Sequence, residues 1–144
     1  LALTIGGIAG GWLISRYGLK KMLWPMAIAI NAPNVAYVLL AWLQPQSWLV
    51  IGTALCIEQF GYGLGFAAYL VYMMMVAAGP HQTAHYAICT GFMALGMMLP
   101  GMPAGWLQEQ VGYVNFFAWV CLATIPSLVM TALITVDPKF GKKA

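Results

Sequence analysis

The sequence predicts an all-α protein, a polytopic bundle of membrane-spanning helices, on three observations. Of the 144 residues, 62% are hydrophobic and only 6% are charged, and a soluble domain cannot cover so apolar a chain with polar surface. Short polar breaks separate apolar segments that are long enough to cross a bilayer. Lys and Arg occur in two short clusters, and residues 22–138 between the clusters contain neither. We therefore expect lipid to surround this fold.

Five apolar segments follow one another along the chain, and each is expected to form one helix. The first would rise only about 21 Å, less than the roughly 30 Å of hydrocarbon in a bilayer, so we expect a partial helix in a chain that is a fragment. The other four are long enough for tilted transmembrane helices. The expected helices of this half-bundle, a single domain over 1–144, are 1–14, 22–43, 47–78, 84–107 and 113–136.

Four breaks separate these helices, and Pro100 and Pro103 predict a bend in the fourth helix. Because successive transmembrane helices alternate in direction, the first break, the third break and the C-terminal tail should share one side. Both basic clusters then lie on that side, which the positive-inside rule makes cytoplasmic. The breaks are Arg16–Lys21, Gln44–Ser47, Gly79–Thr83 and Gln108–Gly112, and the clusters are Arg16, Lys20 and Lys21 near the start and Lys139, Lys142 and Lys143 at the end.

A short motif occurs twice. Gly11-Trp12-Leu13 followed by Gly18 recurs as Gly105-Trp106-Leu107 followed by Gly112, each time where one helix ends and the next begins. The two copies are expected on opposite sides of the membrane, as an inverted three-helix repeat would place them. Chance similarity of two glycine-rich helix ends is the alternative.

Glu58 is the only acidic residue within an apolar segment. If its helix starts near Ser47, Glu58 lies about 16 Å along the axis, close to the bilayer midplane. A carboxylate at that depth costs about 3 kcal/mol or more, so it should face protein or a water-filled cavity. We interpret Glu58 as a candidate for proton coupling or substrate binding. The alternative is a neutral side chain that is hydrogen-bonded across helices, or one paired with a residue outside this chain.

Other polar side chains are also expected at membrane depth. Asn31 and Asn34 share a face of the second segment, beside Pro33, which frees a backbone carbonyl. Tyr62 and Tyr69 lie on the same face of the third segment as Glu58. These two asparagines and two tyrosines are candidates for lining a binding cavity, and hydrogen bonding between helices is an equal alternative for the asparagines.

The histidines do not predict a metal site. His81 and His85 are four residues apart, but Pro80 and Thr83 predict a loop and an N-cap, which leaves His81 outside the helix. His85, at the expected cytoplasmic mouth, is a candidate pH-sensitive gate, although an interfacial anchor is the simpler interpretation. The three cysteines lie within apolar segments and lack metal-ligand spacing, so we interpret them as packing residues.

Other classes of function are not favoured. The basic residues are too few, and lie too close to segment ends, for a nucleic-acid surface. An enzyme that used Glu58 and His85 as acid and base would need them together, whereas they are expected more than about 10 Å apart along the membrane normal. The Gly61, Gly63 and Gly65 run has no βαβ context for a dinucleotide, so it marks either a gating helix or, as we favour, close packing. A membrane sensor or scaffold remains an alternative.

The stretch Gly11–Lys21 resembles the cytoplasmic loop signature of the major facilitator superfamily, G-x-L-x-D-R-x-G-R-K. Its signature residues here are Gly11, Ser15, Arg16, Gly18, Lys20 and Lys21. Ser15 stands where the family usually has Asp, which weakens a charge-relay role for this copy. The stretches Glu58–Tyr69, Thr83–Ile88 and Pro103–Leu107 are similar to the AmpG-type muropeptide permeases and their acetyl-CoA-transporter relatives.

This resemblance implies the C-terminal part of a twelve-helix transporter, from the end of helix eight through helix twelve. It implies proton-driven import of anhydromuropeptides across a bacterial inner membrane by alternating access, with a sugar, peptide or drug as the alternative cargo. Glu58 would then be the protonation or substrate residue. The partners implied are a small-molecule substrate, a proton, the lipid bilayer and the N-terminal helices of the same chain, and no cofactor is implied.

Overall fold

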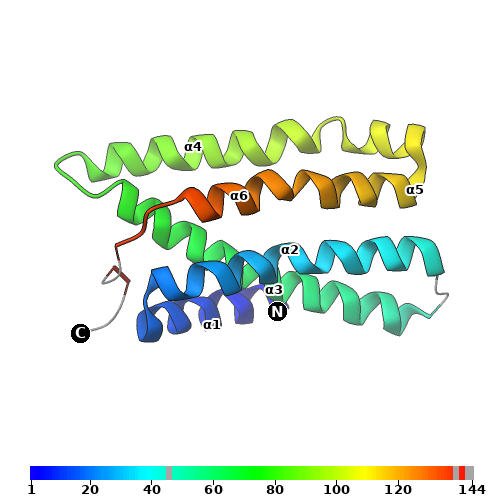
Figure 1. Ribbon diagram of the computed structural model, residues 1–144, viewed down its shortest axis with the longest axis horizontal. Helices are drawn as coiled ribbons and strands as arrows, with labels where there is room; N and C mark the ends of the chain where they lie inside the picture. The colour runs from blue at the N-terminus through cyan, green and yellow to red at the C-terminus, as the bar shows by residue number, and fades with distance from the viewer. Residues whose placement is uncertain (45–46, 138–139, 142–144) are drawn as a thin grey trace.

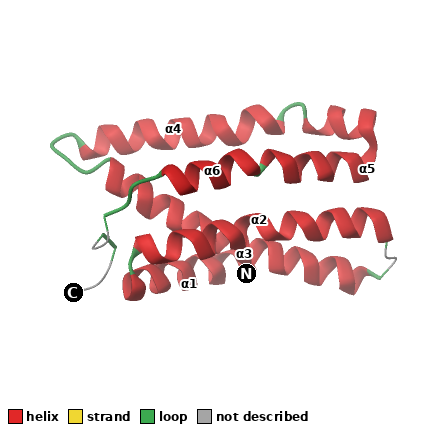
Figure 2. Ribbon diagram, viewed as in Figure 1, coloured by secondary structure: helices red, strands yellow, loops and turns green. Residues whose placement is uncertain are grey.

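The structure, a computed structural model, describes residues 1–44, 47–137 and 140–141. These ranges contain helices joined by short turns and no strand (Figure 2). The helices are α1 (Ala2–Tyr17), α2 (Leu19–Leu43), α3 (Trp48–Val76), α4 (Gln82–Gly101), α5 (Ala104–Ala123) and α6 (Ile125–Leu133). The all-α prediction is confirmed.

The helices run back and forth along the long axis of the bundle (Figure 1). The direction reverses within α5, at Gly112, whose φ of 76° and ψ of 163° interrupt the helical geometry. The first part of α5 therefore continues the pass that α4 begins, and the remainder of α5 forms the returning pass with α6. The expected helices at 84–107 and 113–136 correspond to these two passes.

The two ends of the bundle carry different residues. The α1–α2 turn, the α3–α4 turn and the end of the described chain lie at one end, which we call the basic end because it carries Arg16, Lys20 and Lys21 (Figure 1). The α2–α3 connection and the Gly112 reversal lie at the other. This is the alternation that the sequence predicts. The second predicted basic cluster, Lys139, Lys142 and Lys143, lies outside the described residues, as do Pro45 and Gln46 of the second predicted break.

Three helical stretches of the described chain are long and apolar enough to cross a membrane, namely Leu19–Leu43, Trp48–Val76 and Ala104–Leu133. The last includes the Gly112 reversal. Large aromatic side chains at the end opposite the basic end are well exposed, as in the interfacial belts of membrane proteins, and these are Trp42, Trp48, Trp106 and Tyr113.

The first predicted break is shorter in the structure than the sequence suggests. Helix α1 continues to Tyr17 and α2 begins at Leu19, so Gly18 alone connects them. Gly18 has φ 87° and ψ 151°, a conformation open only to glycine, which lets one residue reverse the chain. Arg16 therefore lies in the last turn of α1, and Lys20 lies in the first turn of α2.

The helix is interrupted near Pro100 and Pro103, where the sequence predicts a bend. Helix α4 ends at Gly101 and α5 begins at Ala104, so two residues between them leave the helix. Pro103 has no N–H to continue the ladder of hydrogen bonds, and it lies immediately before the new helix. The pass is therefore two helical pieces joined at the prolines.

Glycines bring α3 against α1 and α2. A Cβ atom on Gly61 would clash with the backbone carbonyl of Ala29 on α2, and a Cβ atom on Gly65 would lie 2.7 Å from the Cβ atom of Ile30. On the opposite side of α3, Gly63 approaches the backbone of α1 at Leu3 in the same way. The glycine run thus serves close packing, the alternative that the sequence analysis favours over a gating helix.

The most buried side chains lie toward the basic end. Ile14, Leu19 and Met26 are at most 2% exposed, and Val136, beyond α6, packs with them. The chain after α6 also reaches the α1–α2 turn, where the backbone N–H of Leu19 donates a hydrogen bond of 3.1 Å to the carbonyl of Phe140. This bond satisfies one of the free N–H groups at the start of α2.

Candidate functional site

Glu58 lies on α3, half-buried, about 15 Å along the axis from the start of the helix. Its Oε2 accepts a hydrogen bond of 2.9 Å from Nε2 of the neighbouring Gln59. The phenol of Tyr37, on α2, lies beside the Glu58 carboxyl group and interacts with it. Tyr37 in turn stacks on Phe117 of α5, with ring centroids 5.5 Å apart. The carboxyl group therefore has one polar neighbour on its own helix and one on α2.

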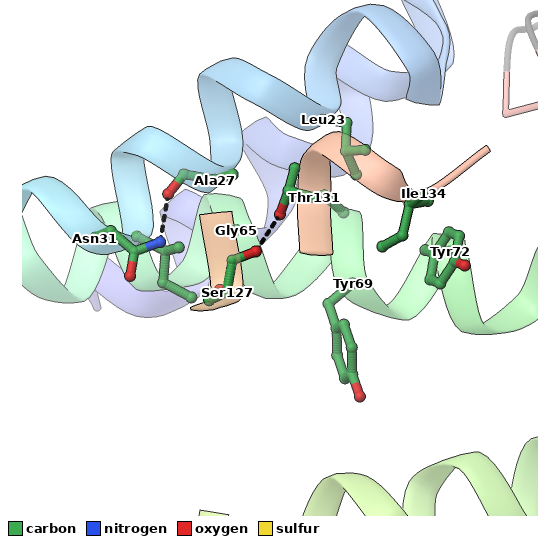
Figure 3. Close-up of a pocket in the computed structure, with 11 residues that line it drawn as sticks. Leu23, Ala27, Asn31, Gly65, Tyr69, Tyr72, Ser127, Thr131 and Ile134 are labelled. Carbon is green, nitrogen blue, oxygen red and sulfur yellow. Dashed lines mark hydrogen bonds between the residues drawn. The ribbon is translucent and has the colours of Figure 1, made fainter. Parts of the chain in front are cut away.

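A first hollow, of about 200 Å³, lies between α2, α3 and α6 (Figure 3). Asn31 lines it from α2, and its Nδ2 donates to the carbonyl of Ala27, in the same helix, at 2.7 Å. Tyr72 contributes from α3. Helix α6 adds Ser127 and Thr131, and the Thr131 hydroxyl donates to the Ser127 carbonyl at 2.9 Å. The lining is apolar with a few polar groups, as in small-molecule sites.

A second hollow, of about 280 Å³, adjoins the first on the α4 side. Tyr62 and Phe66, whose rings stack with centroids 5.8 Å apart, line it from α3. Phe92 faces them from α4. Tyr69 lines both hollows, and in Figure 3 its ring points away from Asn31. Tyr69 therefore joins the two spaces.

The structure brings together three of the four predicted cavity residues. Asn31 and Tyr69 meet in the first hollow, and Tyr62 and Tyr69 meet in the second. Asn34 is half-buried on α2 and lines neither hollow, and Glu58 lies apart from both. The candidate coupling residue and the candidate cavity thus occupy different places along α3.

The hydroxyl groups that α2 and α6 add were not among the predicted site residues. Tyr37 lies three residues after Asn34, so helical periodicity alone places it near the predicted polar face. Ser127 and Thr131 are four residues apart in an apolar helix, which also puts them on one face. Their meeting with α2 and α3 depends on tertiary packing, which the sequence pattern does not specify.

The loop signature forms a tight turn with exposed basic side chains, and Arg16 has no acidic neighbour at position 15. The Ser15 hydroxyl donates to the Trp12 carbonyl at 2.8 Å, a bond within its own helix. The Arg16 guanidinium lies over the Trp12 ring, 5.4 Å from its centroid, and 5.7 Å from that of Tyr17. Gly11 meets no neighbouring group, whereas Gly18 makes the reversal. Arg16 is thus held by aromatic rings.

The two histidines lie at the start of α4 and are exposed. The helix begins at Gln82, and its N-cap is His81. The N-cap therefore lies two residues before Thr83, the predicted cap. The His81 and His85 rings are 6.4 Å apart, edge to face. Within the described ranges, no group of three metal-ligating side chains comes together.

Comparison with known proteins finds several relatives that are similar in sequence to this chain. The anhydromuropeptide permease of Escherichia coli strain K12 is 27% identical over 130 residues, which cover 90% of this chain and 26% of that protein. An uncharacterised Haemophilus influenzae protein is 26% identical over 87% of the chain and 31% of its own length. A Rickettsia prowazekii protein named as an AmpG transporter is 23% identical over 88% of the chain and 28% of its own length. The chain thus spans about a quarter to a third of these relatives. No protein-family model and no solved structure matches it.

Proposed function

We propose, because the chain resembles the AmpG-type permeases along nine-tenths of its length, that it is part of a secondary transporter of the inner membrane. The cargo proposed is anhydromuropeptide or a related solute, taken up by alternating access. The observation that carries the proposal is this similarity to a permease in a chain built of apolar, membrane-length helices. The named function of the relative and the membrane architecture point to the same class, a transporter rather than an enzyme.

The chain supplies part of the transporter. We propose that further helices complete the machinery, since the chain spans 26% of the length of the Escherichia coli permease. We place residues 1–144 in the C-terminal half-bundle, with the basic end and the C-terminus in the cytoplasm. The support is the gathering of Arg16, Lys20 and Lys21 at one end of the bundle, with Glu109 near the opposite reversal (Figure 1).

Glu58 is proposed to couple transport to protons. It is the one acidic residue of the apolar segments, it is half-buried, and a second helix presents the Tyr37 phenol to it. A carboxylate in such surroundings can alternate between a proton and a polar neighbour as the helices rearrange. The hollows lined by Asn31, Tyr62 and Tyr69 are proposed to contribute to the solute pathway, together with helices outside this chain.

The test is uptake by the whole transporter in a strain that lacks other muropeptide permeases. Glu58→Gln is expected to abolish accumulation of labelled anhydromuropeptide against its gradient, while solute exchange across proteoliposomes continues, because exchange needs no net proton movement. Glu109→Gln, an identical change near the opposite end of the bundle, is the matched control and should transport normally. Full accumulation by correctly inserted Glu58→Gln would refute the coupling role.

The cargo is tested separately. Purified wild-type transporter in proteoliposomes is offered anhydromuropeptide, a sugar, a peptide and a drug under the same proton gradient. Uptake of anhydromuropeptide alone supports the proposed cargo. Uptake of another solute alone assigns the protein to a different branch of the transporter class, and no uptake of any solute favours the sensor or scaffold alternative.

A further inference from the structure

The α1–α2 turn concentrates positive charge at one edge of the bundle. Because Gly18 alone joins the helices, Arg16 in the last turn of α1 and Lys20 and Lys21 in the first turn of α2 lie within one tight reversal. All three side chains are exposed. The described tail adds one acidic residue, Asp137, against these three basic residues, so the turn keeps a net positive charge.

Arg16 is oriented for an external anion. The residue before it, Ser15, has no carboxylate that could pair with the guanidinium. The Ser15 hydroxyl donates a hydrogen bond to the Trp12 carbonyl. The guanidinium instead lies over the Trp12 and Tyr17 rings, at 5.4 and 5.7 Å. Contact with a ring face leaves the N–H groups at the rim of the guanidinium available, and these suit two oxygens of a phosphate.

The surroundings of the turn favour a lipid over a soluble anion. Trp12 and Tyr17, which contact Arg16, are 56 and 44% exposed, and Trp24, one helical turn after Lys20 on α2, is 45% exposed. Amphipathic rings of this kind settle at the headgroup level of a bilayer, and acyl chains can pack on their apolar faces. A soluble phosphate would use the charges and gain nothing from the rings.

We infer that the α1–α2 turn is a binding site for an anionic phospholipid, whose phosphate is held by Arg16, Lys20 and Lys21 and whose chains lie against Trp12 and Trp24. The inference is independent of the cargo and of proton coupling. It gives the basic cluster a local ligand, beyond a general role in setting orientation.

The experiment measures lipid retention by the whole purified transporter. Protein in mild detergent is incubated with phosphatidylglycerol or phosphatidylcholine of the same acyl chains, and bound lipid is counted by native mass spectrometry. The wild type is expected to retain several-fold more phosphatidylglycerol. The Arg16→Gln, Lys20→Gln, Lys21→Gln triple variant should bind it at least roughly tenfold more weakly. The Glu109→Gln variant, changed near the other end of the bundle, should bind like the wild type.

A second pair of variants protects the test against failed membrane insertion. Arg16→Lys keeps the positive charge that directs membrane orientation but loses the paired N–H donors of the planar guanidinium. Trp12→Leu keeps every charge but removes the ring that Arg16 lies over. Both are expected to retain less phosphatidylglycerol at normal yield and orientation. Unchanged retention in the triple variant would overturn the inference. So would displacement of phosphatidylglycerol by an equal concentration of inorganic phosphate, which would assign the turn to a soluble anion.

Discussion

Gly18 and Gly112 adopt nearly the same backbone conformation at opposite ends of the bundle, with φ, ψ of 87°, 151° and 76°, 163°. Each lies seven residues after the glycine of a Gly-Trp-Leu motif, and each alone reverses the chain between two antiparallel helices. This conformation is essentially limited to glycine. The common geometry favours the inverted repeat over chance similarity of two glycine-rich helix ends.

The first prediction concerns the Gly112 reversal. Gly112→Ala is expected to lower the free energy of unfolding by about 1–3 kcal/mol, because a Cβ atom is strained at this φ and ψ whatever space surrounds it. Gly105→Ala, in the helical part of α5, also has open space around it and should be neutral or slightly stabilising. Detergent-mediated unfolding of the whole protein measures both changes. Equal stability of the two variants would contradict the strain argument.

The positions of the helices could be predicted because the polar breaks stand out against long apolar runs. The interruption between α4 and α5 near Pro100 and Pro103 follows from missing backbone donors, so it was also predictable. The exact length of the first break was not. The run from Arg16 to Lys21 looks like a loop by charge, but its residues tolerate a helix, and only Gly18 is needed for the turn.

The candidate site could be predicted only in part. Periodicity along one helix placed Tyr62 and Tyr69 on a shared face, and both line the second hollow. Periodicity does not say which other helix faces that surface. The contributions of Tyr37 and Thr131 depend on how α2 and α6 pack, which is a tertiary property. Asn34 was predicted to share a helix face with Asn31, but only Asn31 lines the first hollow.

The second prediction concerns the close approach of α3 and α2. Gly61→Ala is expected to lower the free energy of unfolding by about 1–3 kcal/mol, since its Cβ atom would clash with the Ala29 carbonyl, a backbone group that cannot rotate away. Gly52→Ala, on the same helix, meets no atom within 4 Å and serves as the matched control. Thermal unfolding of the purified protein compares them. Unchanged or increased stability of Gly61→Ala, which the higher helix propensity of Ala alone would give, would contradict the packing argument.

The third prediction concerns the buried cluster at the basic end. Ile14→Ala is expected to cost about 2–5 kcal/mol, because Ile14 is 2% exposed and packs against Leu19 and Val136. Ile8, on the same helix, is 70% exposed, and Ile8→Ala should cost far less. Limited proteolysis near the C-terminus provides a second readout, with faster cleavage expected in Ile14→Ala only. Similar stability and cleavage in both variants would mean that the tail does not depend on this cluster.

The fourth prediction tests whether Tyr37 acts through Glu58. Tyr37→Phe removes the hydroxyl beside the carboxyl group but keeps the ring that stacks on Phe117. The free energy of unfolding should therefore change by no more than about 1.5 kcal/mol, the range of one hydrogen bond. Proton-driven accumulation should fall in the wild-type background.

In the Glu58→Gln background, Tyr37→Phe should have no further effect on solute exchange, because two groups that act as one unit are not additive. Exchange in proteoliposomes is the appropriate readout there, since Glu58→Gln is itself expected to abolish accumulation. Phe117→Leu, which removes the stacking partner but neither polar group, should reduce stability in both backgrounds alike. An additional loss of exchange in the Tyr37→Phe, Glu58→Gln double variant would mean that the phenol serves another part of the transporter.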